Sequence, residues 1–398
     1  MKPFSKRQKP KLHLADILRT HLGDYQNSYP LSPDQHRIVS HLLNCRTPNL
    51  GGHLHRCNHC GAERIRYHSC RNRHCPTCQH IPRERWIEAR KSELLPAAYF
   101  HIVFTLPHEL NPLILKNKSV TLTILFKAVA KTLLTFGENK LGGKLGFVAV
   151  LHTWDQQIKD HFHIHCLVAG GALCSKTKRW IPGKDTYLFN QEALSLVFRG
   201  KFVHSLTRAV RKGKLDVDDP YQQFKARLYK HKWVVSVRKP IKEPQHVLEY
   251  LARYTHRVAI ANARLTALED GNVSFRYKDR KNNTLKTATI SAVKFIRRFL
   301  LHTLPSGFVR IRHYGFLANR NRTANLNFIQ RLLKVPSHVL KKNHSLQEMM
   351  AKLTGIDITR CPSCLKGTMH AVAHIPRHRA QHPHGLIRPP NLQTSAIG

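Results

Sequence analysis

The sequence predicts an α+β fold in which strands joined by tight turns alternate with helices. Residues 147–151 are apolar, residues 162–169 alternate apolar with polar side chains, and Gly170 and Gly171 follow the second run. This pattern predicts two strands joined by a polar loop. Residues 113–136 carry apolar side chains at helical spacing, which predicts a long helix before this hairpin.

The other elements are expected on the same grounds of apolar spacing, caps and turn residues. Helices are predicted over residues 12–22, 32–44, 84–95, 191–211, 221–231, 244–257, 291–301, 322–334 and 345–354. Strands are predicted over residues 99–107, 233–240, 258–261, 273–277, 287–290 and 308–315. The expected domains are 1–95, helical and cysteine-rich; 96–305, with a helical insertion near 172–232; 306–365, basic; and 366–398, a disordered tail.

The charge of the chain points to a polyanionic partner. Lys and Arg total 66 against 23 Asp and Glu, which gives a net charge of +43. An excess of this size favours nucleic acid, with an anionic membrane surface as the alternative. The chain shows no run of roughly 18 apolar residues and no apolar segment after its basic N-terminus, so we expect a cytoplasmic protein with no membrane partner.

The cysteine spacing predicts structural zinc. Cys57 and Cys60 form one CxxC pair, and Cys75 and Cys78 form another. Two such pairs separated by a short segment can bring four thiolates round one tetrahedral zinc ion, so these four are the expected ligands, with Cys70 as a spare.

A later CxxC pair is a candidate for a second zinc site. Cys361 and Cys364 are followed by His370 and His374, which could complete the ligand set. Cysteines in such pairs fit a reducing compartment better than a disulfide framework.

A row of histidines lies in the second strand of the hairpin. His161, His163 and His165 stand two residues apart, so their side chains share one face of the strand while the apolar residues between them face a core. Imidazoles arranged in this way can hold a divalent metal ion. In a chain with 29 histidines, an exposed row without a metal is the alternative.

The helix expected over 244–257 carries a pair of tyrosines. Tyr250 and Tyr254 are four residues apart and therefore lie on one face, about one turn from each other. Taken alone, they suit packing of the helix on a sheet. Beside a metal ion that activates phosphorus, a tyrosine hydroxyl could attack a DNA phosphodiester and keep the bond energy in a 5′-phosphotyrosyl link.

Together these features resemble a known family. His163-Ile164-His165 resembles the His-hydrophobe-His motif of the HUH endonucleases, and residues 250–254 resemble their two-tyrosine helix. Residues 104–107 resemble their first strand motif. The chain is similar to transposases of the insertion sequence 91 family from about residue 30 to 365, most closely over segments 69–79, 161–171, 254–261 and 310–319.

The resemblance implies an HUH-type antiparallel sheet with helices packed on one face, preceded by a small zinc-binding module. It implies rolling-circle transposition, in which single-stranded DNA is cut and joined at the transposon ends by Tyr250 and Tyr254. It also implies Mg²⁺ or Mn²⁺ at His163 and His165. Beside the tyrosines, Arg253 and Arg257 could hold the scissile phosphate or serve as general DNA-facing charge.

The sequence does not decide which residue is the third ligand of the metal ion. The candidates are close in sequence to the histidine row, and Gln156 is favoured over Asp155, His161 and His152. The chain departs from the family pattern at Phe162 and Ala169, where proline is expected, but both positions are away from the side chains expected to bind the metal ion.

Other functions fit parts of the pattern. A plasmid or phage replication initiator or a relaxase would share the chemistry, although the cysteine module favours the transposase. A zinc-stabilised nucleic-acid-binding protein without catalysis would use the tyrosines for packing alone. A zinc hydrolase using the three histidines would need a carboxylate base, for which Asp155 and Asp160 are close in sequence.

Overall fold

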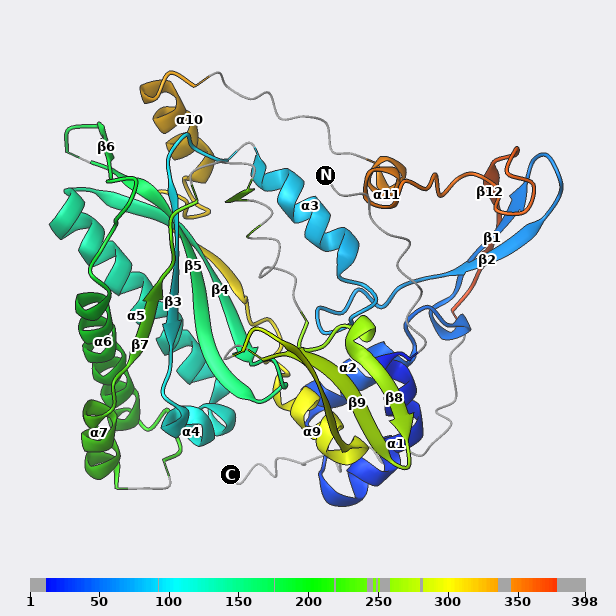
Figure 1. Ribbon diagram of the computed structural model, residues 1–398, viewed down its shortest axis with the longest axis horizontal. Helices are drawn as coiled ribbons and strands as arrows, with labels where there is room; N and C mark the ends of the chain where they lie inside the picture. Colours follow the sequence, from blue (N-terminus) through cyan, green and yellow to red (C-terminus); the bar gives the residue numbers. More distant parts are fainter. Residues whose placement is uncertain are drawn as a thin grey trace, which may run out of the picture.

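A six-stranded antiparallel sheet forms the centre of the molecule (Figure 1). The computed structural model describes residues 12–91, 93–174, 176–217, 220–241, 246, 247, 250, 258–279, 282–335 and 345–377. The strands run in the order β11-β4-β5-β3-β7, with β6 paired to β5. Their bounds are Tyr99–Thr105 (β3), Lys144–Trp154 (β4), Asp160–Leu173 (β5), Trp180–Pro182 (β6), Val234–Val237 (β7) and Ile311–Gly315 (β11).

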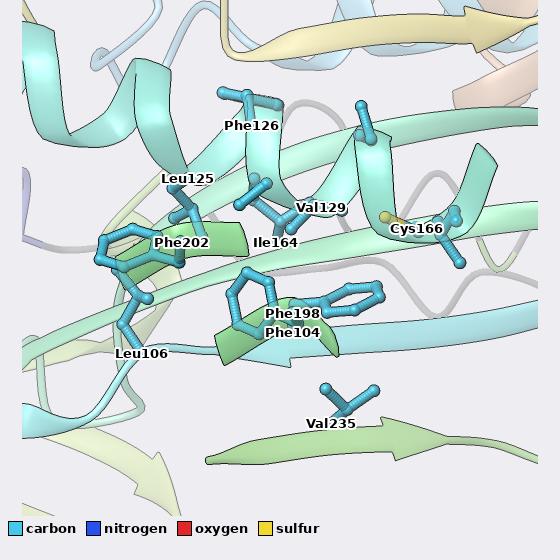
Figure 2. Close-up of a cluster of buried hydrophobic side chains, with 14 of the residues drawn as sticks. Phe104, Leu106, Leu125, Phe126, Val129, Ile164, Cys166, Phe198, Phe202 and Val235 are labelled. Atoms are coloured by element: carbon cyan, nitrogen blue, oxygen red, sulfur yellow. The ribbon is translucent and has the colours of Figure 1, made fainter. Parts of the chain in front are cut away.

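Helices cover one face of this sheet, on the left of Figure 1. They are α5 (Lys118–Phe136), α6 (Gln191–Arg211) and α7 (Tyr221–Lys230), with the short α4 (Asn111–Lys116) at the end of α5. Figure 2 shows aromatic and aliphatic side chains from α5, α6 and the strands packed together, among them Phe104, Phe126, Ile164 and Phe198. The α+β fold with helices on one face of an antiparallel sheet is thereby confirmed.

The helical stretch Lys118–Leu141, which consists of α5 and the π turn after it, is long and apolar enough to cross a membrane by length and composition alone. About 67% of its most apolar window is buried inside the protein, where residues such as Leu122, Leu125 and Val129 pack on the sheet. This burial identifies α5 as a core helix, whose apolar character comes from being covered on several sides.

The pleat of β5 separates the core from the functional face. Phe162, Ile164 and Cys166 are completely buried in the core under α5 and α6. His163 and His165 alternate with them and therefore point to the opposite face of the sheet. Burying one large apolar side chain contributes roughly 1.5–3 kcal/mol, so a one-residue slip of β5 would be strongly unfavourable.

A second core joins the N-terminal helices to a later part of the chain. Helices α1 (Leu14–Ser28) and α2 (Pro33–Leu43) pack with α9 (Ala292–Leu301) and with the small antiparallel sheet of β8 (Leu265–Glu269), β9 (Asn272–Lys278) and β10 (Leu285–Ser291). The expected boundary at residue 95 is therefore corrected, since α1 and α2 share a core with residues 259–300.

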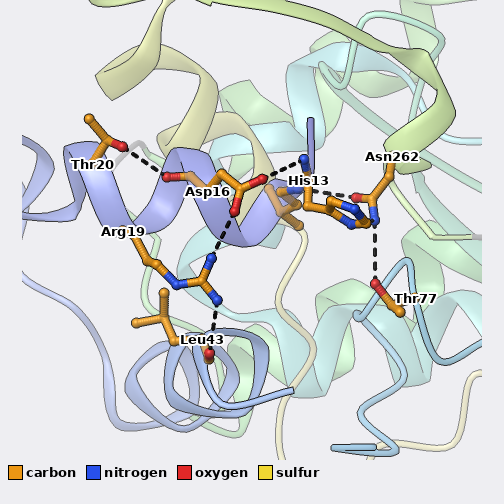
Figure 3. A network of polar contacts seen from close by, with 8 residues as sticks. His13, Asp16, Arg19, Thr20, Leu43, Thr77 and Asn262 are labelled. Carbon is orange, nitrogen blue, oxygen red and sulfur yellow. Dashed lines mark hydrogen bonds and ion pairs between the residues drawn. The ribbon is translucent and has the colours of Figure 1, made fainter. Parts of the chain in front are cut away.

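Figure 3 shows a polar network that reinforces this contact. The Asn262 side chain accepts a hydrogen bond from Leu14 N at 3.1 Å. Its amide group also lies 2.8 Å from His13 Nδ1 and donates to Thr77 Oγ1 at 3.3 Å. Because Asn262 is 7% exposed, these bonds satisfy a buried amide and fix the cysteine-rich segment against α1.

An N-terminal hairpin and a C-terminal strand meet in a third sheet. Strand β1 (Gly52–Cys57) lies between β2 (Glu63–Tyr67) and β12 (Met369–Ile375), antiparallel to both. The expectation of a disordered tail from residue 366 is wrong for β12, because pairing with β1 satisfies its backbone. Residues 378–398 lie outside the described residues.

Three further helices complete the description: α3 (His80–Lys91), α10 (Arg322–Leu332) and α11 (Leu346–Thr354). Strand β11 pairs with β4, so the expected domain of residues 306–365 is not separate from the central sheet. Residues 258–261, expected as a strand, have no regular structure. Their apolar side chains Ala259 and Ile260 are instead buried in the core under α1.

A buried histidine makes the stability of this fold depend on pH. His302 donates from Nε2 to Ile158 O at 3.1 Å, and its Nδ1 lies 3.2 Å from Thr153 Oγ1. Burial lowers the pKa of His302 to about 4. In the unfolded chain this histidine binds a proton below about pH 6.5, whereas in the folded protein it binds one only near pH 4. The unfolding free energy that depends on neutral His302 is therefore complete above about pH 6.5 and is lost as the pH falls toward 4.

We therefore expect His302 to account for about 2 kcal/mol of unfolding free energy lost between pH 7.5 and pH 5. Urea unfolding of the wild type and of His302→Gln at both pH values measures this difference, since the variant lacks the titrating group. Equal pH dependence in the two proteins would refute the assignment.

Candidate functional site

Three histidines meet on the face of the sheet opposite α5 and α6. His152 on β4 is paired in register with His163 on β5, and His165 follows two residues further along the same face. One ring nitrogen from each lies within 4.8 Å of the others. His152 and His163 are only 3% and 4% exposed, so the three nitrogens form a largely buried donor set.

Backbone contacts fix how His163 can act. His163 Nδ1 lies 2.8 Å from the carbonyl oxygen of His161. A carbonyl only accepts, so Nδ1 carries the proton and Nε2 carries the lone pair that can bind a metal ion. His161 therefore orients His163 through its backbone, and its own ring lies beside that of His108 at the rim.

A fourth histidine connects this cluster to a tyrosine. His101 on β3 places Nε2 2.8 Å from His165 Nδ1 and Nδ1 2.6 Å from Tyr250 Oη. The His101 and His165 rings are stacked with centroids 5.0 Å apart. Burial, with the charge of Arg238 nearby, lowers the pKa of His101 to about 4, so the ring is neutral at neutral pH.

The cluster opens into a cavity of about 940 Å³. Its walls carry the four histidines and several cationic side chains, together with Asp155 and Gln156. The cations are Lys232, Arg238 and Lys278. Such a concave, basic and imidazole-lined space suits an anionic substrate.

The donor set fits a divalent transition metal ion. Three imidazoles each place a ring nitrogen within 4.8 Å of the others, and the backbone bond of His163 leaves its Nε2 as the nitrogen that can bind metal. Nitrogen donors suit Mn²⁺ and the later transition metals better than Mg²⁺, which prefers carboxylate, water and phosphate oxygens.

The first cysteine cluster consists of Cys45, Cys70, Cys75 and Cys78. Sγ of Cys45 lies 3.3 Å from that of Cys78 and 3.7 Å from that of Cys75. Sγ of Cys70 lies 3.7 Å from that of Cys78. Four thiolates about 2.3 Å from a tetrahedral zinc ion would be about 3.8 Å apart, so these spacings fit zinc.

The second cysteine cluster consists of Cys57, Cys60, Cys361 and Cys364. Sγ of Cys57 lies 3.8 Å from that of Cys364, and Sγ of Cys60 lies 3.7 Å from that of Cys361. Backbone N–H groups point at two of the sulfurs, from His59 to Cys57 and from Gly367 to Cys364. N–H bonds of this kind stabilise the thiolates that zinc requires.

The expected grouping of Cys57, Cys60, Cys75 and Cys78 round one zinc ion is therefore wrong. The β1–β2 hairpin carries the first CxxC pair toward the C-terminal segment, while the second pair turns back to Cys45 after α2. Cys45 and Cys70 complete the cluster of Cys75 and Cys78, whereas Cys361 and Cys364 complete that of Cys57 and Cys60. The C-terminal CxxC pair, Cys361 and Cys364, does join a four-ligand cluster. Its other two ligands are cysteines and not His370 and His374.

Comparisons with known proteins match the chain to transposases. A family described as "Putative transposase" matches residues 146–325, and a "Transposase zinc-binding domain" matches residues 17–106. The protein named "Putative transposase y4qJ" from Sinorhizobium fredii (strain NBRC 101917 / NGR234) is 41% identical over 372 residues, which cover 89% of this chain and 94% of that protein.

The chain belongs to the insertion sequence 91 family of transposases. A second relative, the "Transposase for insertion sequence element IS801" from Pseudomonas savastanoi pv. phaseolicola, is 26% identical over 342 residues, or 82% of this chain and 80% of that protein. No solved structure matches the chain. The match to the zinc-binding domain identifies this transposase as a zinc protein.

The described residues bring several of the predicted site residues together. His163 and His165 lie in the cluster, and Tyr250 reaches it through His101. Gln156, the favoured third ligand, lines the same cavity, while His152 supplies the third nitrogen of the converging set. Tyr254, Arg253 and Arg257 lie outside the described residues.

Sequence reasoning missed His101 and Cys45. His101 stands two residues before Val103 in an alternating strand, so its outward direction could have been read from the period of β3. Its approach to β5 depends on strand order, which the spacing does not contain. Cys45 stands alone in the sequence, with no second cysteine nearby to form a CxxC pair.

Gly367 allows the second cysteine cluster to close. A Cβ at this position would lie 2.4 Å from Cys57 Sγ and 2.6 Å from the His59 Cβ. We therefore expect Gly367→Ala to loosen β12 from β1 and to increase proteolytic cleavage near residues 355–377. Gly200→Ala is the matched control, because nothing lies within 4 Å of its added Cβ and alanine favours the helix. Equal resistance in both variants would show that the cluster does not hold this segment.

Proposed function

We propose that this transposase moves its element by a rolling-circle route, nicking and joining single-stranded DNA at the element ends through 5′-phosphotyrosine intermediates. The observation that carries the proposal is the chain of contacts from Tyr250 Oη to His101 and on to His165, at 2.6 and 2.8 Å. A tyrosine joined in this way to imidazole donors that line a basic cavity supplies a nucleophile beside candidate metal ligands, as phosphodiester transfer requires.

In the proposed step, Tyr250 Oη attacks the phosphorus of a phosphodiester. The Oη–P bond forms, the P–O3′ bond breaks, and its electron pair and one proton end on the released 3′-OH. A divalent ion, when bound, polarises the phosphate and offsets the charge on the leaving oxygen. Arg238 and Lys232 line the same cavity and are placed to orient the DNA backbone.

The energetics suit strand transfer. The phosphotyrosyl link conserves the energy of the phosphodiester, so the 3′-OH of another strand can displace Tyr250 without ATP. Tyr254 is the proposed second nucleophile, which would cut while Tyr250 remains loaded. Arg253 and Arg257 are proposed to contact the scissile phosphate.

His152, His163 and His165 are the proposed ligands of the catalytic ion, and Gln156 lies in the wall of the same cavity. The nitrogen-rich set supports Mn²⁺ over Mg²⁺ as the ion that binds more tightly. The remaining coordination positions would be filled by water and phosphate oxygens.

Each cysteine cluster is proposed to bind one structural zinc ion. The second cluster is supported by more than its sulfur spacing. β12 pairs with β1 from Gly52 to Cys57, and Asn58 exchanges hydrogen bonds with Thr368, by Asn58 N at 3.1 Å and Asn58 Oδ1 at 2.8 Å. Zinc at this cluster would tie residues 361–364 to the N-terminal module across some 300 residues of chain.

The proposed function is tested by cleavage of single-stranded DNA from the element end, with Mn²⁺ present. We expect a covalent protein–DNA product with the wild type and its loss when Tyr250 and Tyr254 are both changed to Phe. His163→Ala with His165→Ala should lower the rate by at least about 100-fold, because the metal donors are removed. A covalent product that persists in the double Tyr→Phe variant would contradict the mechanism.

The zinc assignment predicts two zinc ions per chain. Cys361→Ser with Cys364→Ser should leave one ion, and Cys70→Ser with Cys75→Ser should also leave one if the variant remains folded. Cys174→Ser is the matched control, since Cys174 belongs to neither cluster among the described residues. Metal analysis of the purified proteins gives the count, and one zinc ion in the wild type would overturn the assignment of two sites.

A further inference from the structure

His101 is buried beside the proposed site but is neither a proposed metal ligand nor the proposed nucleophile. It is 4% exposed, on the strand next to β5, between the proposed nucleophile and a proposed metal ligand. Both of its ring nitrogens are used, Nε2 toward His165 Nδ1 and Nδ1 toward Tyr250 Oη. Which group donates in each hydrogen bond depends on which ring nitrogen of His101 carries the proton.

Metal binding through Nε2 of His165 decides the direction. A neutral imidazole carries one proton, so a metal on Nε2 leaves the proton of His165 on Nδ1. That Nδ1–H then donates to His101 Nε2, as ligating histidines commonly donate to an acceptor behind them. His101 consequently carries its own proton on Nδ1 and donates it to Tyr250 Oη.

We propose that His101 is a positioning residue through which an ion at the histidine cluster orders the hydrogen bond to Tyr250 Oη. This inference rests on the proposed function. The bond holds Oη with its lone pairs available for attack and stabilises negative charge on Oη when the tyrosine is displaced from phosphorus in the joining step. In attack, Tyr250 gives its proton to water and the leaving 3′-oxygen takes up one proton from water, so His101 neither gains nor loses a proton overall.

The opposite role, His101 as the base that accepts the tyrosine proton, conflicts with metal binding. In that arrangement His101 Nε2–H donates to His165 Nδ1, and the proton of neutral His165 must sit on Nε2. The Nε2 lone pair that would bind the ion is then absent.

Three substitutions separate the two hydrogen bonds of His101. The amide of glutamine reaches the position of Nε2 and can accept from His165, whereas the amide of asparagine reaches the position of Nδ1 and can donate to Tyr250. Alanine removes both. Mn²⁺ affinity without DNA, measured by electron paramagnetic resonance, reports the first bond, and single-turnover cleavage at saturating Mn²⁺ reports the second.

We expect His101→Ala and His101→Asn to weaken Mn²⁺ binding about 10- to 100-fold, with His101→Gln close to wild type. We expect His101→Ala and His101→Gln to slow cleavage about 10- to 100-fold, with partial recovery in His101→Asn. Tyr250→Phe should abolish its share of cleavage and leave Mn²⁺ affinity within a few-fold of wild type.

The outcomes are distinguishable. Wild-type Mn²⁺ affinity in His101→Ala, or the same pattern of losses in the Gln and Asn variants, would overturn the role of His101. If the metal affinities follow the prediction but Tyr250→Phe with Tyr254→Phe still forms the covalent product, the proposed function fails while the contact from His101 to His165 stands. Unchanged zinc content in every variant serves as the control for folding.

Discussion

The two-residue period of β5 is the constraint on which the site depends. Because the core takes Phe162, Ile164 and Cys166, the strand must present His163 and His165 on the other face. The same period in β3 and β4 presents His101 and His152 beside them. The proposed metal ligands and their partners are thus positioned by the packing of apolar side chains on the opposite face of the sheet.

The cysteine clusters are expected to stabilise the fold. The β1–β2–β12 sheet is small, and the buried cluster beside it consists of Cys57, Cys361 and Met369. So few apolar groups supply little hydrophobic stabilisation, and metal binding can replace it. The first cluster lies instead within the core of α1, α2 and α9, where Cys75 and Cys78 are buried, so zinc there would join the N-terminal module to the body of the protein.

Periodicity and spacing predicted the elements well where the cause is local. The hairpin of β4 and β5 and the caps at Ser32 and Ser291 follow from side-chain pattern and are present. The helix predicted over 113–136 is present in two parts, α4 and α5, which are separated at Asn117. Partnerships between distant segments were not predictable, because spacing carries no information on strand order. That limit explains the wrong pairing of the cysteines, the missed His101 and the placement of β11 and β12.

The central claim is that Tyr250 becomes covalently joined to DNA in a site organised by the buried histidines. The most direct measurement is mass spectrometry of the peptides left after nuclease and protease digestion of the Mn²⁺ cleavage product. We expect a nucleotide attached through its 5′-phosphate to the tyrosine of the peptide that contains Tyr250. The attached nucleotide should be absent when His163 and His165 are replaced. A nucleotide on a serine, or on a tyrosine outside residues 244–257, would contradict it.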